Sequence, residues 1–302
     1  IIPHLWFDKE AKQAASFYCS VFADSDIEHV TTLHDTPSGD CDVVSFRLSG
    51  QPFMAISAGP LFKFNPSISF IVNFDPSEHD HAREYLDKVW DELSKDGTVL
   101  MPLNEYPFSK RYGWIQDRYG LSWQLILSDP EGEKGPFIVH SLMFTGQVYG
   151  KAEEASEFYL SVFKNAKRGN LFRYPDGMHP DKEGTIMMTD FRLEDTWFAA
   201  MDSAYPHNFA FNEAISFLVK CDSQDEIDAY WQKLSAVPEA EQCGWCKDQY
   251  GVSWQVSPAV LEEMMRNGSK EQVDQITQAF LKMKKFDIAE LTKAYEGETV
   301  RA

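Results

Sequence analysis

The first 60 residues show a pattern of hydrophobic and polar positions that predicts a strand, a helix and two further strands. Residues 1–7, "IIPHLWF", have the composition of a strand, and residues 11–22 follow with apolar side chains every three or four positions, as in an amphipathic helix. The apolar positions of that helix are Ala11, Ala14, Ala15, Tyr18 and Phe22. Residues 41–50 and 51–57 then read as strands that meet at a turn at Gly50.

The next 70 residues add a strand, a second helix and a hairpin. Residues 67–74 predict a strand, and residues 77–97 predict a helix with a serine cap at its start and a glycine stop at its end. Residues 112–117 and 121–127 flank the sequence Arg-Tyr-Gly as the two strands of a hairpin. We therefore expect a βαβββ-like module with a second helix before its last strands.

The whole pattern occurs twice along the chain. "GWIQDRYGLSWQL" at 113–125 returns as "GWCKDQYGVSWQV" at 244–256, with eight of thirteen positions identical. Three further segments return in the same order, namely 16–22 as 157–163, 45–56 as 190–201, and 64–75 as 211–222. A repeat of this size indicates a tandem duplication of a domain. The polar segment 128–136, rich in glycine and proline, reads as a linker, so the modules are 1–130 and 136–258.

Residues 259–302 form a predicted helical tail. Val273, Ile276, Phe280 and Met283 make one apolar stripe along it. We expect this stripe to pack on the modules, and an alternative is that the tail mediates oligomer formation.

Composition and charge narrow the possible partners. The net charge of −19 disfavours nucleic acid and anionic membranes. No apolar run is long enough to span a bilayer, and the start carries no secretory signal pattern. The five cysteines, an odd number, fit reduced thiols, so we expect a cytoplasmic protein. "CGWC" at 243–246 has the spacing of a redox pair, but its alignment with the first repeat places it on a strand, which argues against that role.

The motif set resembles the vicinal-oxygen-chelate superfamily of glyoxalases, dioxygenases and antibiotic-resistance proteins, and within it the PhnB-like branch. The segments that carry the resemblance are 5–11, 17–22, 59–70, 243–256 and 281–297. The resemblance implies an α+β fold of two tandem βαβββ-type modules whose curled mixed sheets enclose a cavity. Because one chain holds both modules, we expect a monomer with intramolecular module pairing, or a homodimer.

Metalloenzymes of that superfamily place ligands on the first and last strands of each module, and the last-strand ligand is usually glutamate. The resemblance puts Gln124 and Gln255 at that position and His4 on a first strand, with His140 one residue out of step in the second module. An amide oxygen binds a divalent cation more weakly than a carboxylate does. We therefore expect no cofactor. If a divalent metal binds, its ligands are His4, Gln124 and Gln255, with His140 as a further candidate.

Two other interpretations of these polar residues stay open. They are structural groups hydrogen-bonded inside the barrel, or they hold an organic ligand without metal. Aromatic residues on or beside strands would then line the pocket, although each also suits a core. These candidates are Trp6, Phe53, Phe62, Phe64, Trp123 and Trp254.

We expect the protein to bind a small organic molecule in a cavity between the modules. The alternative is a metal-dependent lyase, isomerase or dioxygenase of the same superfamily. Members of the PhnB-like branch often carry the label 3-demethylubiquinone-9 3-methyltransferase. The turn after the first strand, "WFDKEAKQ", lacks the glycines that the common S-adenosylmethionine-binding fold uses there, which argues against that activity.

Overall fold

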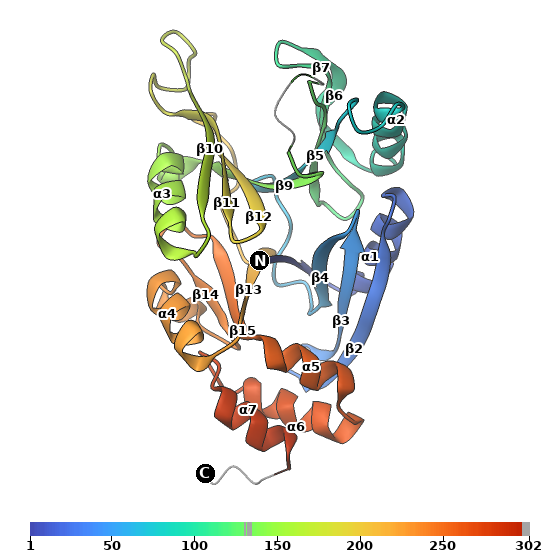
Figure 1. The fold of residues 1–302 in the computed structure, drawn as a ribbon, viewed down its shortest axis with the longest axis vertical. Coiled ribbons are helices and arrows are strands. Elements are labelled where there is room, and N and C mark those ends of the chain that lie inside the picture. Colours follow the sequence, from blue (N-terminus) through green and yellow to red (C-terminus); the bar gives the residue numbers. More distant parts are fainter. Residues whose placement is uncertain (130, 132–134, 298–302) are drawn as a thin grey trace. The chain divides into compact units, whose positions relative to one another are not determined.

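The computed structural model describes residues 1–129, 131 and 135–297, and it divides into two compact units. Unit 1 consists of Ile1–Lys63 and Asn212–Ala302, and unit 2 consists of Phe64–Phe211. Each unit is built around one mixed sheet (Figure 1). The predicted α+β class with two mixed sheets and a helical C-terminal part is confirmed. The predicted linker lies partly outside the described residues.

Unit 1 contains a seven-stranded sheet in the order β14-β15-β13-β1-β4-β3-β2. Helix α1 (Ala11–Val21) packs on β2, β3 and β4, and helix α4 (Gln224–Leu234) packs on β13, β14 and β15. The strands are β1 (Ile2–Phe7), β2 (Asp26–Thr36), β3 (Gly39–Leu48), β4 (Gln51–Ser57), β13 (Ile215–Cys221), β14 (Trp245–Lys247) and β15 (Ser253–Pro258). A short 3-10 helix, η2 (Pro238–Ala240), precedes β14.

Unit 2 contains an eight-stranded sheet in the order β10-β11-β12-β9-β5-β8-β7-β6. Helix α2 (Ala82–Leu93) packs on β5, β7 and β8, and helix α3 (Ala152–Val162) packs on β9, β11 and β12. The strands are β5 (Ile68–Phe74), β6 (Thr98–Tyr106), β7 (Ser109–Gln116), β8 (Ser122–Leu127), β9 (Ile138–Phe144), β10 (Lys167–Arg173), β11 (Ile186–Leu193) and β12 (Thr196–Asp202). The 3-10 helix η1 (Gly146–Val148) precedes α3.

The compact units divide the chain differently from the sequence repeats. Unit 1 joins the first half of repeat one to the second half of repeat two through antiparallel pairing of β1 with β13. Unit 2 joins the two remaining halves through antiparallel pairing of β5 with β9. In Figure 1 this appears as blue strands beside orange ones in unit 1. Each sheet, and any site on it, is therefore made by both repeats.

Each repeat contains more strands than the pattern predicted. The first repeat holds two βαβββ motifs, β1-α1-β2-β3-β4 and β5-α2-β6-β7-β8, where one such motif with an added helix was expected. The missed strands are β2 and β6 of the first repeat and β10 of the second, which are all edge strands of their sheets. Their side chains are mostly exposed or half-buried, so they lack the alternation of buried and exposed positions by which inner strands are recognised.

The predicted boundaries of helix α2 are wrong at both ends. The helix begins at Ala82, because the Asp75 carboxylate accepts a hydrogen bond from the Ser77 backbone N–H at 2.7 Å and holds Ser77 in a turn. The helix ends at Leu93, four residues before the glycine that was taken as its stop. The turn that Asp75 forms places Ser77 before the helix, so Ser77 does not cap it as predicted.

The repeated "DxYGxSW" segment is a buried structural turn. The Asp117 carboxylate accepts hydrogen bonds from the backbone N–H groups of Tyr119 and Leu121, at 2.8 and 3.1 Å, and from the indole of Trp123 at 2.9 Å. Asp248 does the same in the second repeat, for Tyr250, Val252 and Trp254. The glycine in each copy has a φ of +85° or +91°, which explains its place in the motif. The motif therefore occurs twice because each of the two β-hairpins is held by the same aspartate-centred turn.

The helical tail belongs to unit 1, and of its predicted apolar stripe Phe280 packs on the sheet, whereas Ile276 and Met283 pack within the tail. It forms α5 (Ala259–Asn267), α6 (Lys270–Phe280) and α7 (Ile288–Tyr295). Met264, Ile276, Phe286 and Leu291 make its own core, and Met265 with Phe280 packs onto Leu33, Cys41 and Ala58 of the sheet. Among the described residues, no helix is both long and apolar enough to cross a membrane.

We predict that Asp248→Asn lowers the free energy of unfolding by about 3 kcal/mol, because an amide cannot accept all three hydrogen bonds and places donors against donors. Asp117→Asn should have a similar effect in unit 2. Urea unfolding followed by tryptophan fluorescence measures both. The exposed control Asp195→Asn should change the unfolding free energy by less than about 0.5 kcal/mol. An Asp248→Asn value as small as that of the control would contradict the structural role of this turn.

Candidate functional site

A cavity of about 570 Å³ lies in unit 1, on the face of the sheet that α1 and α4 do not cover. Six strands contribute side chains to it at every second position, which is the spacing that places residues on one face of a strand. These residues are His4 and Trp6 of β1, His29, Thr31 and Leu33 of β2, Cys41, Val43 and Ser45 of β3, Met54 and Ile56 of β4, Leu218 and Lys220 of β13, and Gln255 and Ser257 of β15.

His4 is a buried, neutral imidazole in the wall of this cavity. Its side chain is 4% exposed, and burial lowers its pKa from 6.5 to about 4, so it is uncharged at neutral pH. Its Nδ1 atom is buried without a hydrogen-bond partner among the described residues. The ring of Trp245 meets it edge-on, with 5.7 Å between ring centroids. A buried imidazole nitrogen without a partner is uncommon in folded proteins and calls for an explanation.

Gln255 is the second buried polar group of the cavity wall. Its amide nitrogen donates a hydrogen bond of 2.9 Å to the hydroxyl of Ser216, which lies beside His4 in the β1–β13 ladder. This bond fixes the amide and turns its oxygen away from Ser216. A carbonyl oxygen held in this way accepts hydrogen bonds but carries no charge.

Aromatic rings form the apolar part of the wall around these two groups. Trp6 packs edge-on against Phe62 and Trp245, with centroid distances of 5.1 and 5.9 Å. The indole N–H of Trp6 donates to the carbonyl of Gly59 at 2.8 Å, so its polar atom is already satisfied. Trp6 therefore contributes apolar surface and a fixed shape.

The helical tail supplies the rest of the wall. Leu261 and Met265 of α5, Phe280 of α6 and Phe286 line the cavity. The segment before α7 is held by hydrogen bonds from the Cys243 and Gly244 backbone N–H groups to the carbonyls of residues 283 and 284, at 2.8 and 2.7 Å. Gly244 has a φ of +80°, and a Cβ there would lie 2.5 Å from the Phe286 ring. That the tail lines a site could not be predicted, because its apolar stripe suits any core.

The charged residues around the cavity are largely paired with one another. Lys220 and Arg266 both contact the carboxylate of Glu262, with 2.9 Å from Arg266 Nη2 to Glu262 Oε1. Glu213 pairs with Lys247 at 2.5 Å. Both cationic side chains that line the cavity are thus engaged by an acid.

The equivalent face of unit 2 is filled by its own side chains. Gln124 donates to the hydroxyl of Ser69 at 2.8 Å, as Gln255 does to Ser216, but the hydroxyl of Tyr112 also donates to its amide oxygen at 2.7 Å. Burial raises the pKa of Tyr112, so this hydroxyl stays protonated. By strand register the counterpart of His4 is Ser141. Around these groups Ile71, Val139 and Ala199 pack with Ile126 and Trp197.

The structure brings together four of the predicted site residues. His4, Trp6, Phe62 and Gln255 line the unit 1 cavity, whereas Gln124 and Phe64 belong to unit 2. Phe53, Trp123 and Trp254 are buried beneath the helix-covered faces and do not line the cavity; Phe53 packs on Phe46, and the tryptophans pack on Phe70 and Phe217. Each tryptophan directly precedes its glutamine in a strand, so the two side chains point to opposite faces.

His140 points away from the face that carries Gln124. It packs among Phe70 and Phe198, with centroid distances of 5.5 and 5.2 Å, and burial lowers its pKa to about 3. The one-residue shift between His4 and His140 therefore reverses the direction of the side chain, as the sequence alignment indicated.

Of the suggested metal ligands, only His4 and Gln255 line the unit 1 cavity. His4 and Gln124, two of the three suggested ligands, lie in different units, and His140 faces a core. What remains beside His4 is the amide of Gln255. Within the part of the chain that the structure describes, no group of three histidine, cysteine or acidic side chains is placed to hold a metal ion. Zinc sites use several imidazole or anionic ligands, which this pair does not provide.

The "CGWC" segment is a docking point for the tail. Cys243 has a positive φ of 52°, and Cys246 is fully buried in β14. Burial raises the pKa of both thiols, that of Cys246 to about 12, so both are protonated at neutral pH. Reactive dithiols, by contrast, have a thiol whose pKa is lowered.

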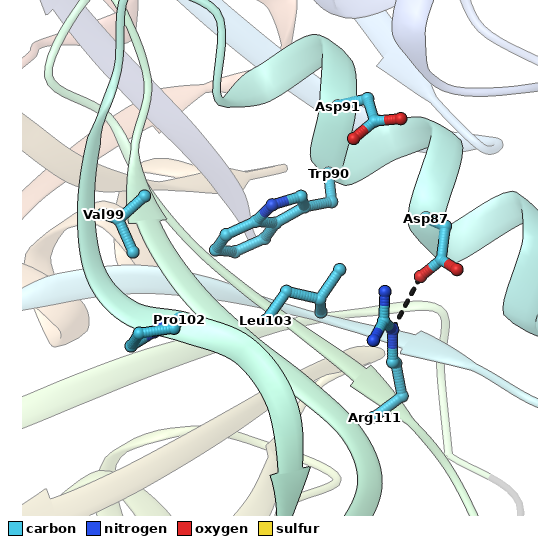
Figure 2. Close-up of a pocket in the computed structure, with 7 residues that line it drawn as sticks. All are labelled: Asp87, Trp90, Asp91, Val99, Pro102, Leu103 and Arg111. Carbon is cyan, nitrogen blue, oxygen red and sulfur yellow. Dashed lines mark hydrogen bonds and ion pairs between the residues drawn. The ribbon is translucent and has the colours of Figure 1, made fainter.

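Unit 2 has a groove of about 450 Å³ between α2 and the β6–β7 hairpin (Figure 2). Trp90 lies over Gly113, where a Cβ would come within 2.5 Å of the indole. Arg111 Nε donates to Asp87 Oδ1 at 2.7 Å, which ties the hairpin to the helix. We place the candidate site in unit 1 because its larger cavity also contains a buried, unpartnered imidazole nitrogen.

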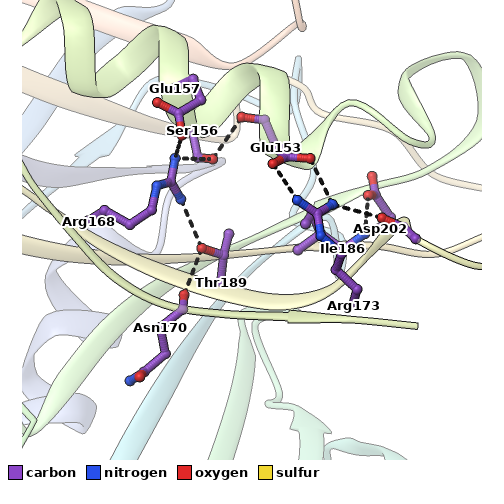
Figure 3. Close-up of polar contacts among 10 residues, drawn as sticks. Glu153, Ser156, Glu157, Arg168, Asn170, Arg173, Ile186, Thr189 and Asp202 are labelled. Carbon is purple, nitrogen blue, oxygen red and sulfur yellow. Dashed lines mark hydrogen bonds and ion pairs between the residues drawn. The ribbon is translucent and has the colours of Figure 1, made fainter. Parts of the chain in front are cut away.

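Polar contacts on the outer side of unit 2 hold α3 to the edge strand β10 (Figure 3). Arg173 contacts both carboxylate oxygens of Glu153, which lowers the pKa of that glutamate. Arg168 donates to Glu157 at 2.6 Å and to Thr189 at 3.0 Å. Burial raises the pKa of nearby Asp202, whose carboxylate accepts three backbone N–H bonds. These contacts explain the acidic residues of α3 as structural partners.

A family model described as 3-demethylubiquinone-9 3-methyltransferase matches residues 1–126 and 136–257. Among solved structures, a putative 3-demethylubiquinone-9 3-methyltransferase, PhnB protein, from Bacillus cereus is 36% identical, covering 42% of this chain and 98% of its own, with a TM-score of 0.38. No functionally curated protein matches the chain.

Two distant solved structures share the fold over most of the chain. Glyoxalase I from Zea mays is 10% identical, covers 88% of this chain and 94% of its own, and has a TM-score of 0.54. A putative dioxygenase from Bacillus subtilis is 9% identical, covers 99% and 96%, and has a TM-score of 0.50. At these identities the similarity concerns the fold alone.

We predict that the two buried histidines make the protein less stable in mild acid. Because the pKa of folded His4 is about 4 and its ordinary value is 6.5, its neutral form favours folding fully above about pH 6.5, and this contribution is lost as the pH falls toward 4. Relative to the unaltered chain, His4→Gln should reduce the loss of unfolding free energy between pH 6.5 and 4 by about 3 kcal/mol.

Urea unfolding at a series of pH values measures this effect. His140→Gln is the matched variant, because His140 is also buried but does not lie on the cavity face. It should likewise reduce the loss of unfolding free energy in acid. A pH profile of His4→Gln that superimposes on that of the unaltered chain would show that His4 is not held neutral by burial.

Proposed function

The chain belongs to the 3-demethylubiquinone-9 3-methyltransferase family, also called PhnB-like, and we propose that it binds a small organic molecule in the unit 1 cavity without a tightly held catalytic metal. The observation that carries this proposal is the buried Nδ1 atom of His4, which lacks a partner among the described residues. A folded protein leaves few such atoms unsatisfied, and each of them calls for an explanation, such as a catalytic role or a bound partner.

The cavity has the character of a small-molecule site. Its volume of about 570 Å³ falls in the range of ligand pockets, which is roughly 300–1,000 Å³. Such pockets are mostly apolar with a few polar groups that orient the ligand. Here Trp6, Phe62 and Met54 supply apolar surface, while His4 and Gln255 supply the polar groups.

Both repeats of a single chain contribute to this wall. His4 comes from repeat one and Gln255 from repeat two, and the β1–β13 ladder places them on the same sheet. We therefore propose that a monomer is competent to bind the ligand. A homodimer would be compatible with the same site.

The family label names a methyl transfer, but the residues support ligand binding better. The segment between β1 and α1 lacks the glycine-rich turn with which common methyltransferase folds hold S-adenosylmethionine, and the sheet at this point is mixed rather than parallel. The alternative is a metal-dependent lyase, isomerase or dioxygenase, which would need His4 and Gln255 to hold the ion. We rank it second because an imidazole and an amide make a weak pair of ligands.

We predict that N-phenyl-1-naphthylamine, an uncharged fluorescent probe, binds the protein at one site per chain. Met54→Trp should weaken this binding about tenfold or more, because the larger side chain occupies the cavity. Fluorescence titration measures the affinity. Met178→Trp, at an exposed position of unit 2, is the matched control and should leave the affinity unchanged. Equal binding by the Met54 variant would contradict the assignment of the site.

Native mass spectrometry tests the metal alternative on the same preparation. After incubation with zinc, nickel, manganese or iron(II), we expect the mass of the polypeptide alone. A retained ion that is lost in His4→Ala would favour the metal-dependent enzyme.

A further inference from the structure

We infer that the ligand of the unit 1 cavity is an uncharged, largely apolar molecule with one hydroxyl group, bound with that hydroxyl at His4 and Gln255. This inference rests on the proposed function and adds the chemical class of the ligand and its orientation. It follows from the hydrogen-bonding state of the two polar groups, the pairing of the charged groups, and the composition of the tail.

The polar groups favour a hydroxyl. Neutral His4 presents a buried Nδ1 that either donates or accepts, depending on its tautomer, and the fixed amide oxygen of Gln255 accepts. A hydroxyl that donates its one proton to the Gln255 amide oxygen accepts a hydrogen bond from the Nδ1–H tautomer of His4. An ether oxygen only accepts and cannot satisfy the amide oxygen of Gln255.

The charges disfavour an anionic ligand. Both cations that line the cavity, Lys220 and Arg266, are engaged by Glu262. The remaining lining acids are Glu213, which pairs with Lys247, and the exposed Glu239. A carboxylate or phosphate on the ligand would lose its hydration beside acids whose partner cations are already taken, which is costly.

The tail determines where the apolar body of the ligand lies. Four apolar side chains of the tail line the cavity, namely Leu261, Met265, Phe280 and Phe286. They carry no hydrogen-bond donor and no charge. Met265 and Phe280 pack against the same buried cluster as Trp6 and Ile56, so this wall adjoins the aromatic one. A ligand with its hydroxyl at His4 and Gln255 therefore buries the rest of its surface against tail and aromatic side chains.

A matched set of fluorescent pyrenes tests the inference. It consists of 1-hydroxypyrene, 1-methoxypyrene, 1-pyrenecarboxylate and 1-pyrenemethylamine, which share one body and differ in the polar group. At pH 7 we expect 1-hydroxypyrene to bind about tenfold tighter than 1-methoxypyrene, as the loss of one hydrogen-bond donor to a buried acceptor implies. The anionic and cationic members should bind at least as weakly as the ether.

Variants then separate the roles of the two residues. Gln255→Leu should reduce the preference for 1-hydroxypyrene over the ether to about twofold or less, because it removes the acceptor of the hydroxyl proton. His4→Phe should weaken the binding of both compounds about equally, because the Nδ1–H group donates to either oxygen. His140→Phe is the control on the core face and should retain the full preference. Circular dichroism verifies that each variant is folded, and two separate variants keep the test valid if one does not fold.

The outcomes separate this inference from the proposed function. Tighter binding of 1-pyrenecarboxylate, or equal binding of the hydroxyl and ether compounds, overturns the ligand class while leaving the cavity as a binding site. If N-phenyl-1-naphthylamine binds and no pyrene does, the inference also fails. If neither probe type binds, the proposed function itself fails.

Discussion

The antiparallel pairing of β1 with β13 is the interaction on which the unit 1 site depends. It joins the first strand of repeat one to the second half of repeat two, with His4 opposite Ser216. Ser216 in turn receives the amide of Gln255 from the next strand, β15. Without this ladder the imidazole and the amide would lie on separate sheets, and the cavity wall formed by β1–β4 would lose β13 and β15.

The two units show how similar backbones can give different surfaces. Both pair a glutamine of the last strand with a serine of the neighbouring parallel strand. In unit 2, Tyr112 occupies the amide oxygen of Gln124, and Ser141 stands where unit 1 has His4. In unit 1 the position that aligns with Tyr112 is Cys243, which lies in the turn that holds the tail. We therefore interpret unit 1 as the binding unit and unit 2 as its filled counterpart.

Much of this fold could be predicted from the sequence, but the pairing of strands between the two repeats could not. The repeats, the hairpins and the tail followed from periodicity, and the opposite directions of His4 and His140 followed from a one-residue shift. The exchange of halves between repeats could not be predicted, because strand alternation does not say which strand pairs with which. For that reason Gln124 was grouped with His4 although they lie in different units.

Other predictions were wrong or incomplete because of features near the residues concerned. Trp123 and Trp254 looked like pocket walls because aromatic residues suit both pockets and cores, yet their indoles are held by Asp117 and Asp248 on the helix side. Edge strand β2 was missed because its side chains are largely half-buried or exposed, and it carries four of the cavity residues. Phe280 was assigned to packing, and the structure shows that it also lines the cavity.

The most direct test of the account is an NMR titration that observes the imidazole nitrogens of His4 and His140 while 1-hydroxypyrene is added at pH 7. The account predicts that the Nδ1 signal of His4 shifts and saturates at one equivalent, while the signals of His140 stay unchanged. A saturable binding event that leaves the His4 nitrogens unshifted would contradict the claim that this buried imidazole holds the ligand.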